Sequence, residues 1–335
     1  MVSIRKESVA RTQASSVQGE NMGANMGKPA IEVDNVSMKF SLSREKVDSL
    51  KDYIFKALKG ELQYNEFWAL KDINFSVEKG DRVGILGLNG AGKSTTIKLI
   101  THAITADAGT ISVLGVDNST KAFLDVKEDI GVVLDEAYFP EVMSAKNVGR
   151  VMAKTYRHWD EGKFQNYLSR FSLPPDKVFM DYSRGMRMKL AIAVALSHDA
   201  KLLILDEATS GLDPMVRDEI LDIFNDFTRE DNHSILLSSH IISDLEKICD
   251  YVAFLHKGQL LLCDEKDRIL EEYTMVRLPM QRLADLPEDS VIARRDNGYG
   301  TEALVHRSRI PEGLPTEHTT LEDIILFLAK GGNQS

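Results

Sequence analysis

The chain is poor in cysteine, which narrows the kinds of protein it can be. Its 335 residues include two cysteines, Cys249 and Cys263, in apolar surroundings and without the spacing of a metal site. A disulfide framework or a zinc domain is therefore excluded. We expect both thiols to be reduced core residues of a cytosolic protein.

Long apolar runs and an excess of basic residues are also missing. No stretch approaches the roughly 18–20 apolar residues that a membrane span needs, so we expect any spans to come from another chain. Lys and Arg number 41 against 51 Asp and Glu, which gives a net charge of −10. Because an acidic surface disfavours nucleic acid, no DNA or RNA partner is predicted.

A glycine-rich loop stands between a short apolar strand, Val83–Leu86, and a helix predicted over Lys93–Ile100. Glycines let such a loop turn its N–H groups toward phosphates, and the helix adds its positive N-terminal end. Lys93 would then reach the β- and γ-phosphates, and the Ser94 hydroxyl would ligate Mg²⁺. The residues predicted to bind nucleotide here are Gly87, Leu88, Asn89, Gly90, Ala91, Gly92, Lys93, Ser94 and Thr95.

Two adjacent carboxylates follow a second buried strand, Leu202–Asp206. An isolated Asp-Glu pair is usually a solvated loop, but here it ends an apolar strand in a chain with a phosphate loop. Asp206 is suited to hold Mg²⁺, and Glu207 could orient and polarise the attacking water. These residues predict hydrolysis of a nucleoside triphosphate.

His240 ends a third apolar strand, over 235–237, and could contact the γ-phosphate from the same sheet edge. Asp213 precedes Pro214 and suits the start of a helix, so its structural role is clear while a nucleotide contact is left open. Ser183 and Gly185, at another helix start, form a second anion-binding nest. Since one nucleotide needs one cradle, the second would serve a nucleotide held by a neighbouring molecule.

Apolar strands alternate with helices through most of the chain, which predicts a mainly parallel sheet covered by helices. After Tyr273 the pattern changes to short strands and a closing helix. The predicted organisation is a disordered leader over 1–29, an ATPase domain over 30–273, a charged helical insert over 41–67, a helical subdomain over about 136–187, a small C-terminal α+β domain over 274–330 and a flexible tail over 331–335.

The order of these motifs resembles that of ABC-type ATPases, the nucleotide-binding subunits of ABC transporters, over about residues 31–272. The resemblance implies an α/β fold: a P-loop NTPase core with a mainly parallel sheet, an antiparallel β subdomain and a helical subdomain. It makes Gly87–Thr95 the Walker A loop, Tyr182–Met186 the signature loop, Leu202–Asp206 Walker B, Glu207 the catalytic carboxylate, Ser210–Asp213 the D-loop and His240 the switch histidine.

The resemblance further suggests that Phe40 stacks on adenine, with Tyr64 and Trp68 as weaker candidates. The chain departs from the family in two motifs. Asp135 stands where glutamine is common, and could still ligate Mg²⁺ or water. Arg184 and Met186 replace a glycine and the glutamine of the signature loop, a form that the ABC-2 exporter branch tolerates.

The implied mechanism uses ATP and Mg²⁺ in two ATPase subunits that face head to tail, as a homodimer or a heterodimer. Both would sit at the cytoplasmic face of the membrane on an ABC-2 type permease, and the branch favours export. Residues 31–100 resemble ATPases exporting polysaccharides or teichoic acids, whereas 125–330 resemble small Gram-positive exporters. The substrate is open between surface polysaccharide and small drug, peptide or lipid-like compounds; a soluble, non-transport ABC ATPase is the alternative.

Overall fold

The computed structural model describes residues 28–43, 64–135, 139–230, 232–283, 285–296 and 300–331. The predicted leader therefore falls almost wholly outside the described residues. So does most of the predicted insert, over 44–63, and so do the last four residues of the predicted tail. Within the described ranges no helix is both long and apolar enough to cross a bilayer.

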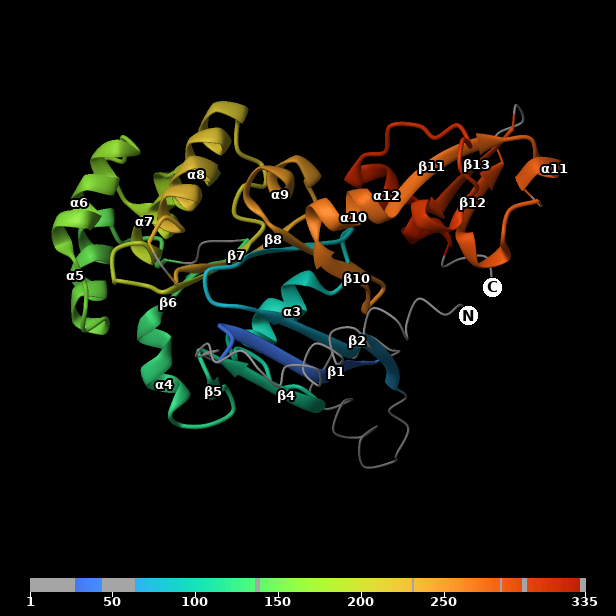
Figure 1. Cartoon of the computed structure of the whole chain (residues 1–335). Coiled ribbons are helices and arrows are strands. Elements are labelled where there is room, and N and C mark those ends of the chain that lie inside the picture. Colours follow the sequence, from blue (N-terminus) through green and yellow to red (C-terminus); the bar gives the residue numbers. More distant parts are fainter. Residues whose placement is uncertain are drawn as a thin grey trace, which may run out of the picture.

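A six-stranded sheet forms the centre of the molecule, in the order β10-β9-β3-β8-β7-β6 (Figure 1). All neighbouring pairs are parallel except β9 and β10, so the predicted mainly parallel sheet is confirmed. Its strands are β3 (Arg82–Leu86), β6 (Ile130–Val133), β7 (Leu202–Asp206), β8 (Ser234–Ser239), β9 (Tyr251–His256) and β10 (Gln259–Glu265).

Two hydrophobic cores cover the two faces of this sheet, because side chains along each strand alternate in direction. In β7, Ile204 joins the core shared with α3 (Lys93–Ile100), whereas Leu203 and Leu205 join the core on the other face. Figure 1 places α3 between the parallel sheet and the antiparallel sheet. The second face is covered by α8 (Pro214–Phe227) and α9 (Ile242–Ile248).

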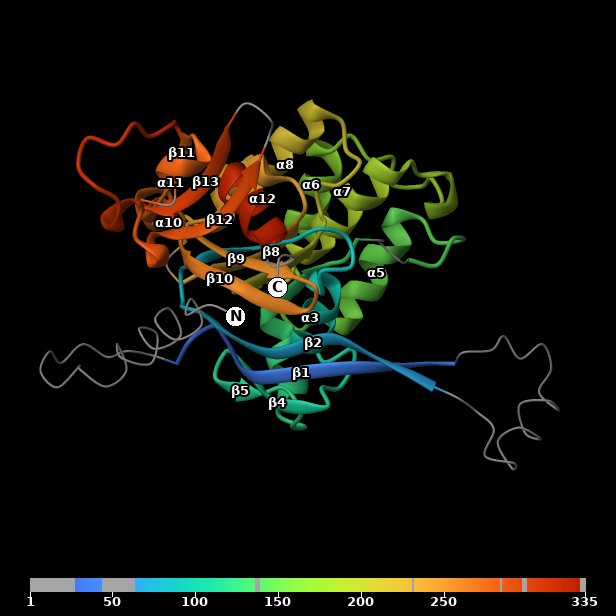
Figure 2. The ribbon, with the colours of Figure 1, turned by 90° about the vertical axis from the view of Figure 1, so that its right-hand side faces the viewer.

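A second, antiparallel sheet has the order β2-β1-β4-β5, with β1 (Ile31–Ser43), β2 (Tyr64–Val77), β4 (Ala108–Val113) and β5 (Val116–Asp117). In Figure 2 the paired ends of β1 and β2 project from the body. The prediction of helix over 41–67 is wrong at both ends, because 41–43 and 64–67 are strand. Aromatic residues flank the segment and favour cross-strand pairing, as Phe40 opposite Phe67 illustrates.

Three helices make up the helical subdomain: α5 (Ala145–Thr155), α6 (Glu161–Arg170) and α7 (Arg184–Ala195). Each begins at a capping side chain, Ser144, Asp160 or Ser183, that accepts a hydrogen bond from the first turn. The remaining short helices are α4 (Phe123–Val126), η1 (Lys127–Asp129), η2 (Phe179–Asp181), η3 (Glu288–Ser290) and η4 (Arg307–Arg309).

The C-terminal part is a three-stranded antiparallel sheet in the order β11-β13-β12. It consists of β11 (Tyr273–Leu278), β12 (Val291–Asp296) and β13 (Thr301–His306), with α11 (Met280–Leu283) and α12 (Leu321–Gly331). The core on one face of this sheet is continuous with that of the ATPase part, because Ile269 of α10 (Lys266–Glu272) and Ile324 of α12 belong to one cluster. The other face has a separate core that includes Val276, Ala303 and Val305. Gly331, predicted to lie in a flexible tail, ends α12.

Candidate functional site

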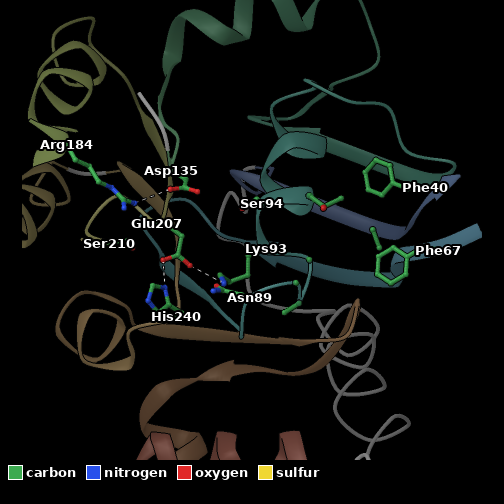
Figure 3. A pocket seen from close by; sticks show the side chains of 15 residues that line it. Phe40, Phe67, Asn89, Lys93, Ser94, Asp135, Arg184, Glu207, Ser210 and His240 are labelled. Carbon is green, nitrogen blue, oxygen red and sulfur yellow. Dashed lines mark hydrogen bonds and ion pairs between the residues drawn. The ribbon is translucent and has the colours of Figure 1, made fainter. Parts of the chain in front are cut away.

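A pocket of about 430 Å³ opens between the two sheets, the phosphate loop and the start of α7 (Figure 3). It unites many of the predicted site residues. The lining residues are Phe40, Phe67, Ala69, Asn89, Gly90, Ala91, Gly92, Lys93, Ser94, Thr95, Asp135, Arg184, Glu207, Ser210 and His240.

The phosphate loop has the backbone that its glycines predict. Gly90 and Gly92 have φ values of 79° and 112°, in the left-handed region that favours glycine. A Cβ at Gly92 would also lie 2.5 Å from the Leu70 side chain. Gly92 is the N-cap of α3 and has no side chain to occupy the first turn. The N–H groups at this helix start are therefore available to an anion.

Lys93 is held at the base of the pocket. Its ammonium group donates a hydrogen bond of 2.7 Å to the Gly87 carbonyl and forms an ion pair with Glu207, with 3.0 Å between Nζ and Oε1. The side chain is only 6% exposed, so its charge is balanced inside the protein by Glu207. Gly87 itself does not line the pocket, and its predicted role in binding nucleotide stays a prediction.

Glu207 also contacts His240. Its Oε2 atom lies 2.6 Å from His240 Nδ1, and the imidazole donates here because a carboxylate only accepts. The Glu207 backbone has a φ of 51°, and its N–H donates to Ser238 in the neighbouring strand. This sharp turn after β7 aims the carboxylate into the pocket between Lys93 and His240 (Figure 3).

Two of the predicted magnesium ligands, Ser94 and Asp135, line the pocket. Asp206 is 2% exposed, ends β7 beside the pocket, and accepts a hydrogen bond of 2.5 Å from Ser238 Oγ. No three His, Cys, Asp or Glu side chains cluster for a metal in the described part of the chain. The fit to Mg²⁺ depends on the carboxylates of Asp206 and Asp135, because this ion commonly takes one or two carboxylates and fills its remaining positions with phosphate and water.

Ser183, Gly185 and Asp213 do not line the pocket. Ser183 accepts a hydrogen bond from Met186 N and caps α7, and Asp213 accepts one from Val216 N and caps α8. Leu88 is 60% exposed and also lies outside the lining. Within one chain, Ser183 and Asp213 therefore have structural roles as helix caps, and Gly185 lies in the first turn of α7.

Four residues that line the pocket were not predicted from the sequence to contact nucleotide: Phe67, Ala69, Arg184 and Ser210. Arg184 forms an ion pair with Asp135, with 3.5 Å between Nη2 and Oδ1, so both departures from the family pattern meet here. Trp68 does not line the pocket, and the ammonium group of Lys39 lies 5.9 Å from its ring centroid. The predicted weaker role of Trp68 in stacking on adenine therefore finds no support in its position.

The phosphate loop, its buried lysine, and a carboxylate fixed between that lysine and a histidine define a P-loop nucleoside triphosphatase site. The sheet order, the antiparallel subdomain and the helical subdomain define the ABC type of this class. In agreement, the family model described as ABC transporter matches residues 70–210.

Known proteins with similar sequences belong to the same class. ABC transporter ATP-binding protein YtrB of Bacillus subtilis (strain 168) is 31% identical over 209 residues, covering 62% of this chain and 71% of that protein. Bacitracin transport ATP-binding protein BcrA of Enterococcus faecalis is 31% identical over 214 residues, with 63% and 69% covered. The chain belongs to the ATP-binding subunits of ABC transporters, and it is an ATPase.

A solved structure supports the fold. The ATP-binding cassette MJ0796, a dimer in a post-hydrolysis state bound to ADP and Pi, matches with a TM-score of 0.59 and 20% identity. The match covers 70% of this chain and 98% of that chain. The predicted ABC ATPase fold is thereby confirmed.

Proposed function

We propose that this subunit drives export by binding ATP in the pocket, closing against a second ATPase subunit, and hydrolysing ATP with Glu207 and His240. The observation that carries the proposal is the chain of contacts from Lys93 through Glu207 to His240. These contacts hold both carboxylate oxygens of Glu207 beside the loop that we propose to bind phosphates. A carboxylate so placed can orient a water molecule and accept its proton.

When phosphate oxygens enter the loop, they replace Glu207 as the ion-pair partner of Lys93. Binding of the nucleotide thus frees Oε1 of Glu207 to accept a hydrogen bond from water, while His240 keeps Oε2 in place. Buried charges of opposite sign are stable together and costly apart, so the incoming phosphate must replace the carboxylate as the partner of Lys93. Catalytic geometry therefore forms only when nucleotide is bound.

Ser94, Asp206 and Asp135 are the residues we propose to hold Mg²⁺, directly or through water. When bound, the ion neutralises the charge that develops on the transferred phosphoryl group. Asp206 keeps one oxygen in a hydrogen bond with Ser238, which fixes its orientation. The buried carboxylate at the strand end and the hydroxyl at the helix start supply oxygen donors, which a hard cation prefers.

A second subunit would complete the site. Ser183 and Gly185 lie at the start of α7, outside the pocket of their own chain, and Asp213 lies at the start of α8. We propose that they contact the nucleotide held by a partner subunit, identical or different. The dimeric cassette with a similar fold supports this proposal by analogy alone.

The partner in the membrane is, in this proposal, an ABC-2 type permease, with the ATPase at the cytoplasmic face. Peptide-type antibiotics are the first substrate candidates, because one relative is named for bacitracin transport. Surface polysaccharide or teichoic acid is the second candidate, and it rests on the sequence of residues 31–100.

Affinity purification tests the assembly. Tagged Glu207→Gln protein is purified from native membranes in mild detergent with ATP and Mg²⁺, and Lys93→Ala protein serves as the control that should not retain ATP. Co-elution of a multi-span membrane protein supports the proposal. Recovery of soluble partners alone, or of ribosomes, would overturn the transport assembly. Deletion of the gene then distinguishes the substrates by comparing sensitivity to peptide antibiotics with the amount of surface polymer.

A further inference from the structure

Two phenylalanine rings lie side by side at one end of the pocket, away from Glu207 and His240 (Figure 3). Phe40 of β1 and Phe67 of β2 are direct partners in the antiparallel ladder, so their side chains lie on the same face of the sheet. Both line the pocket, and they are 39% and 53% exposed. Two neighbouring aromatic rings are thus half uncovered at the mouth of a nucleotide site.

Trp68, the residue next to Phe67, has its contacts outside the pocket. Trp68 is opposite Lys39 in the ladder, and the Lys39 ammonium lies 5.9 Å from its ring centroid. The same ammonium donates a hydrogen bond of 2.9 Å to Glu66. Trp68 is 46% exposed, but its contact with Lys39 lies outside the pocket, whereas Phe67 lines the pocket.

The distance from these rings to the phosphate loop is fixed by backbone hydrogen bonds. Lys71 N, four residues after Phe67, donates to Gly258 O at 2.8 Å, and Gly258 N donates to Ala91 O at 2.9 Å. A Cβ at Gly258 would lie 2.5 Å from Ala69 O, so β2 passes close to this turn. The phosphate loop and β2 are both hydrogen-bonded to Gly258, which fixes the position of Phe67 relative to the phosphate loop.

We propose that Phe67 is a second base-binding residue, and that Phe40 and Phe67 together form an aromatic shelf for the purine of the nucleotide. A purine is large enough to lie across two rings, and stacking on each ring stabilises binding. The phosphate loop then holds one end of the nucleotide and the shelf holds the other. This proposal rests on the proposed binding of ATP in this pocket.

The test measures binding of two ligands to the wild-type protein, Phe67→Ala and Phe67→Tyr, with Trp68→Ala as the matched control. Calorimetry with ATP is compared with calorimetry using inorganic tripolyphosphate, which has no base. We expect Phe67→Ala to raise the Kd for ATP about 5- to 20-fold, from the loss of one stacking contact. The Kd for tripolyphosphate should stay within twofold, and Phe67→Tyr and Trp68→Ala should bind both ligands normally.

Three results would contradict the shelf. The first is an unchanged Kd for ATP in Phe67→Ala, and the second is an equal loss of ATP and tripolyphosphate, which indicates a distorted loop. The third is a loss in Trp68→Ala as large as that in Phe67→Ala. If wild-type protein binds ATP no more tightly than tripolyphosphate, the base adds nothing and the shelf alone fails, whereas a wild-type protein that binds no ATP would overturn the proposed function.

Discussion

Glu207 Oε2 and His240 Nδ1 lie 2.6 Å apart, although the residues are separated by 33 positions in the chain. They meet because β7 and β8 are parallel neighbours with Asp206 opposite Ser238, so both strands end at the same edge of the sheet. The carboxylate begins just after one strand and the imidazole just after the other. A single register in the sheet therefore sets the geometry of the hydrolytic pair.

Replacing Glu207 separates binding from hydrolysis. Glu207→Gln keeps the shape of the side chain but removes the charge that polarises water. We expect ATP to bind and turnover to fall about 100-fold or more, since a positioned base contributes that much. Phosphate release measures turnover, and size-exclusion chromatography with ATP should detect a dimer that does not form without ATP. Turnover near the wild-type rate would remove Glu207 from the reaction.

Lys93 is expected to govern nucleotide binding. Lys93→Ala removes the charged donor at the base of the pocket, so the buried carboxylate of Glu207 loses its ion-pair partner. Binding of ATP should weaken at least about tenfold, because hydrogen bonds to charged groups are the stronger ones. Lys98, an exposed lysine on the same helix, offers the control Lys98→Ala. Equal ATP affinity in the two variants would contradict the role of Lys93.

Arg184 and Asp135 form an ion pair inside the pocket, and the two side chains are 58% and 53% exposed. Arg184→Ala leaves Asp135 as an uncompensated negative charge in the pocket where we propose that phosphates bind. We expect the Kd for ATP to rise up to about fivefold, since exposed pairs contribute at most about 1 kcal/mol. Measured without Mg²⁺, which Asp135 is proposed to hold, the double variant Arg184→Ala with Asp135→Asn should regain most of the affinity at low salt. Additive losses would show that the two residues act independently.

Cys249 should be unreactive in the folded protein. Burial raises the pKa of its thiol from 9.0 to about 12, so almost no thiolate forms at pH 8. Iodoacetamide at pH 8 should spare Cys249 in native protein and modify it in urea, as peptide mass analysis can show. Because the folded pKa is the higher one, the contribution of this group to stability is complete below pH 9 and declines toward pH 12. Rapid native labelling would contradict the burial.

Gly149 lies within α5, where alanine ordinarily favours a helix by about 0.5–1 kcal/mol. Here a Cβ would lie 2.6 Å from the ring of Phe164, which is fully buried. We expect Gly149→Ala to lower the free energy of unfolding by about 1–3 kcal/mol, as overpacking does. Urea denaturation gives the sign directly. A stabilised variant would mean that the ring moves aside freely.

Local patterns in the sequence predicted the phosphate loop, the ends of the buried strands and the helix starts at Ser183 and Asp213, because each of these depends on neighbouring residues. Phe67 could not be found in the same way, since its partner Phe40 lies 27 positions earlier and only the strand register brings them together. Strand β10 was not predicted from the sequence either. The structure shows that it follows a two-residue hairpin, because Lys257 and Gly258 both have positive φ between the paired residues His256 and Gln259.

The C-terminal sheet shares a hydrophobic core with the helix that follows His240. Helix α9 begins two residues after His240, and its Leu245 and Ile248 belong to the same core as Tyr273 and Leu304 of that sheet. The packing behind the histidine therefore extends beyond every residue that lines the pocket, into the part of the chain after α10.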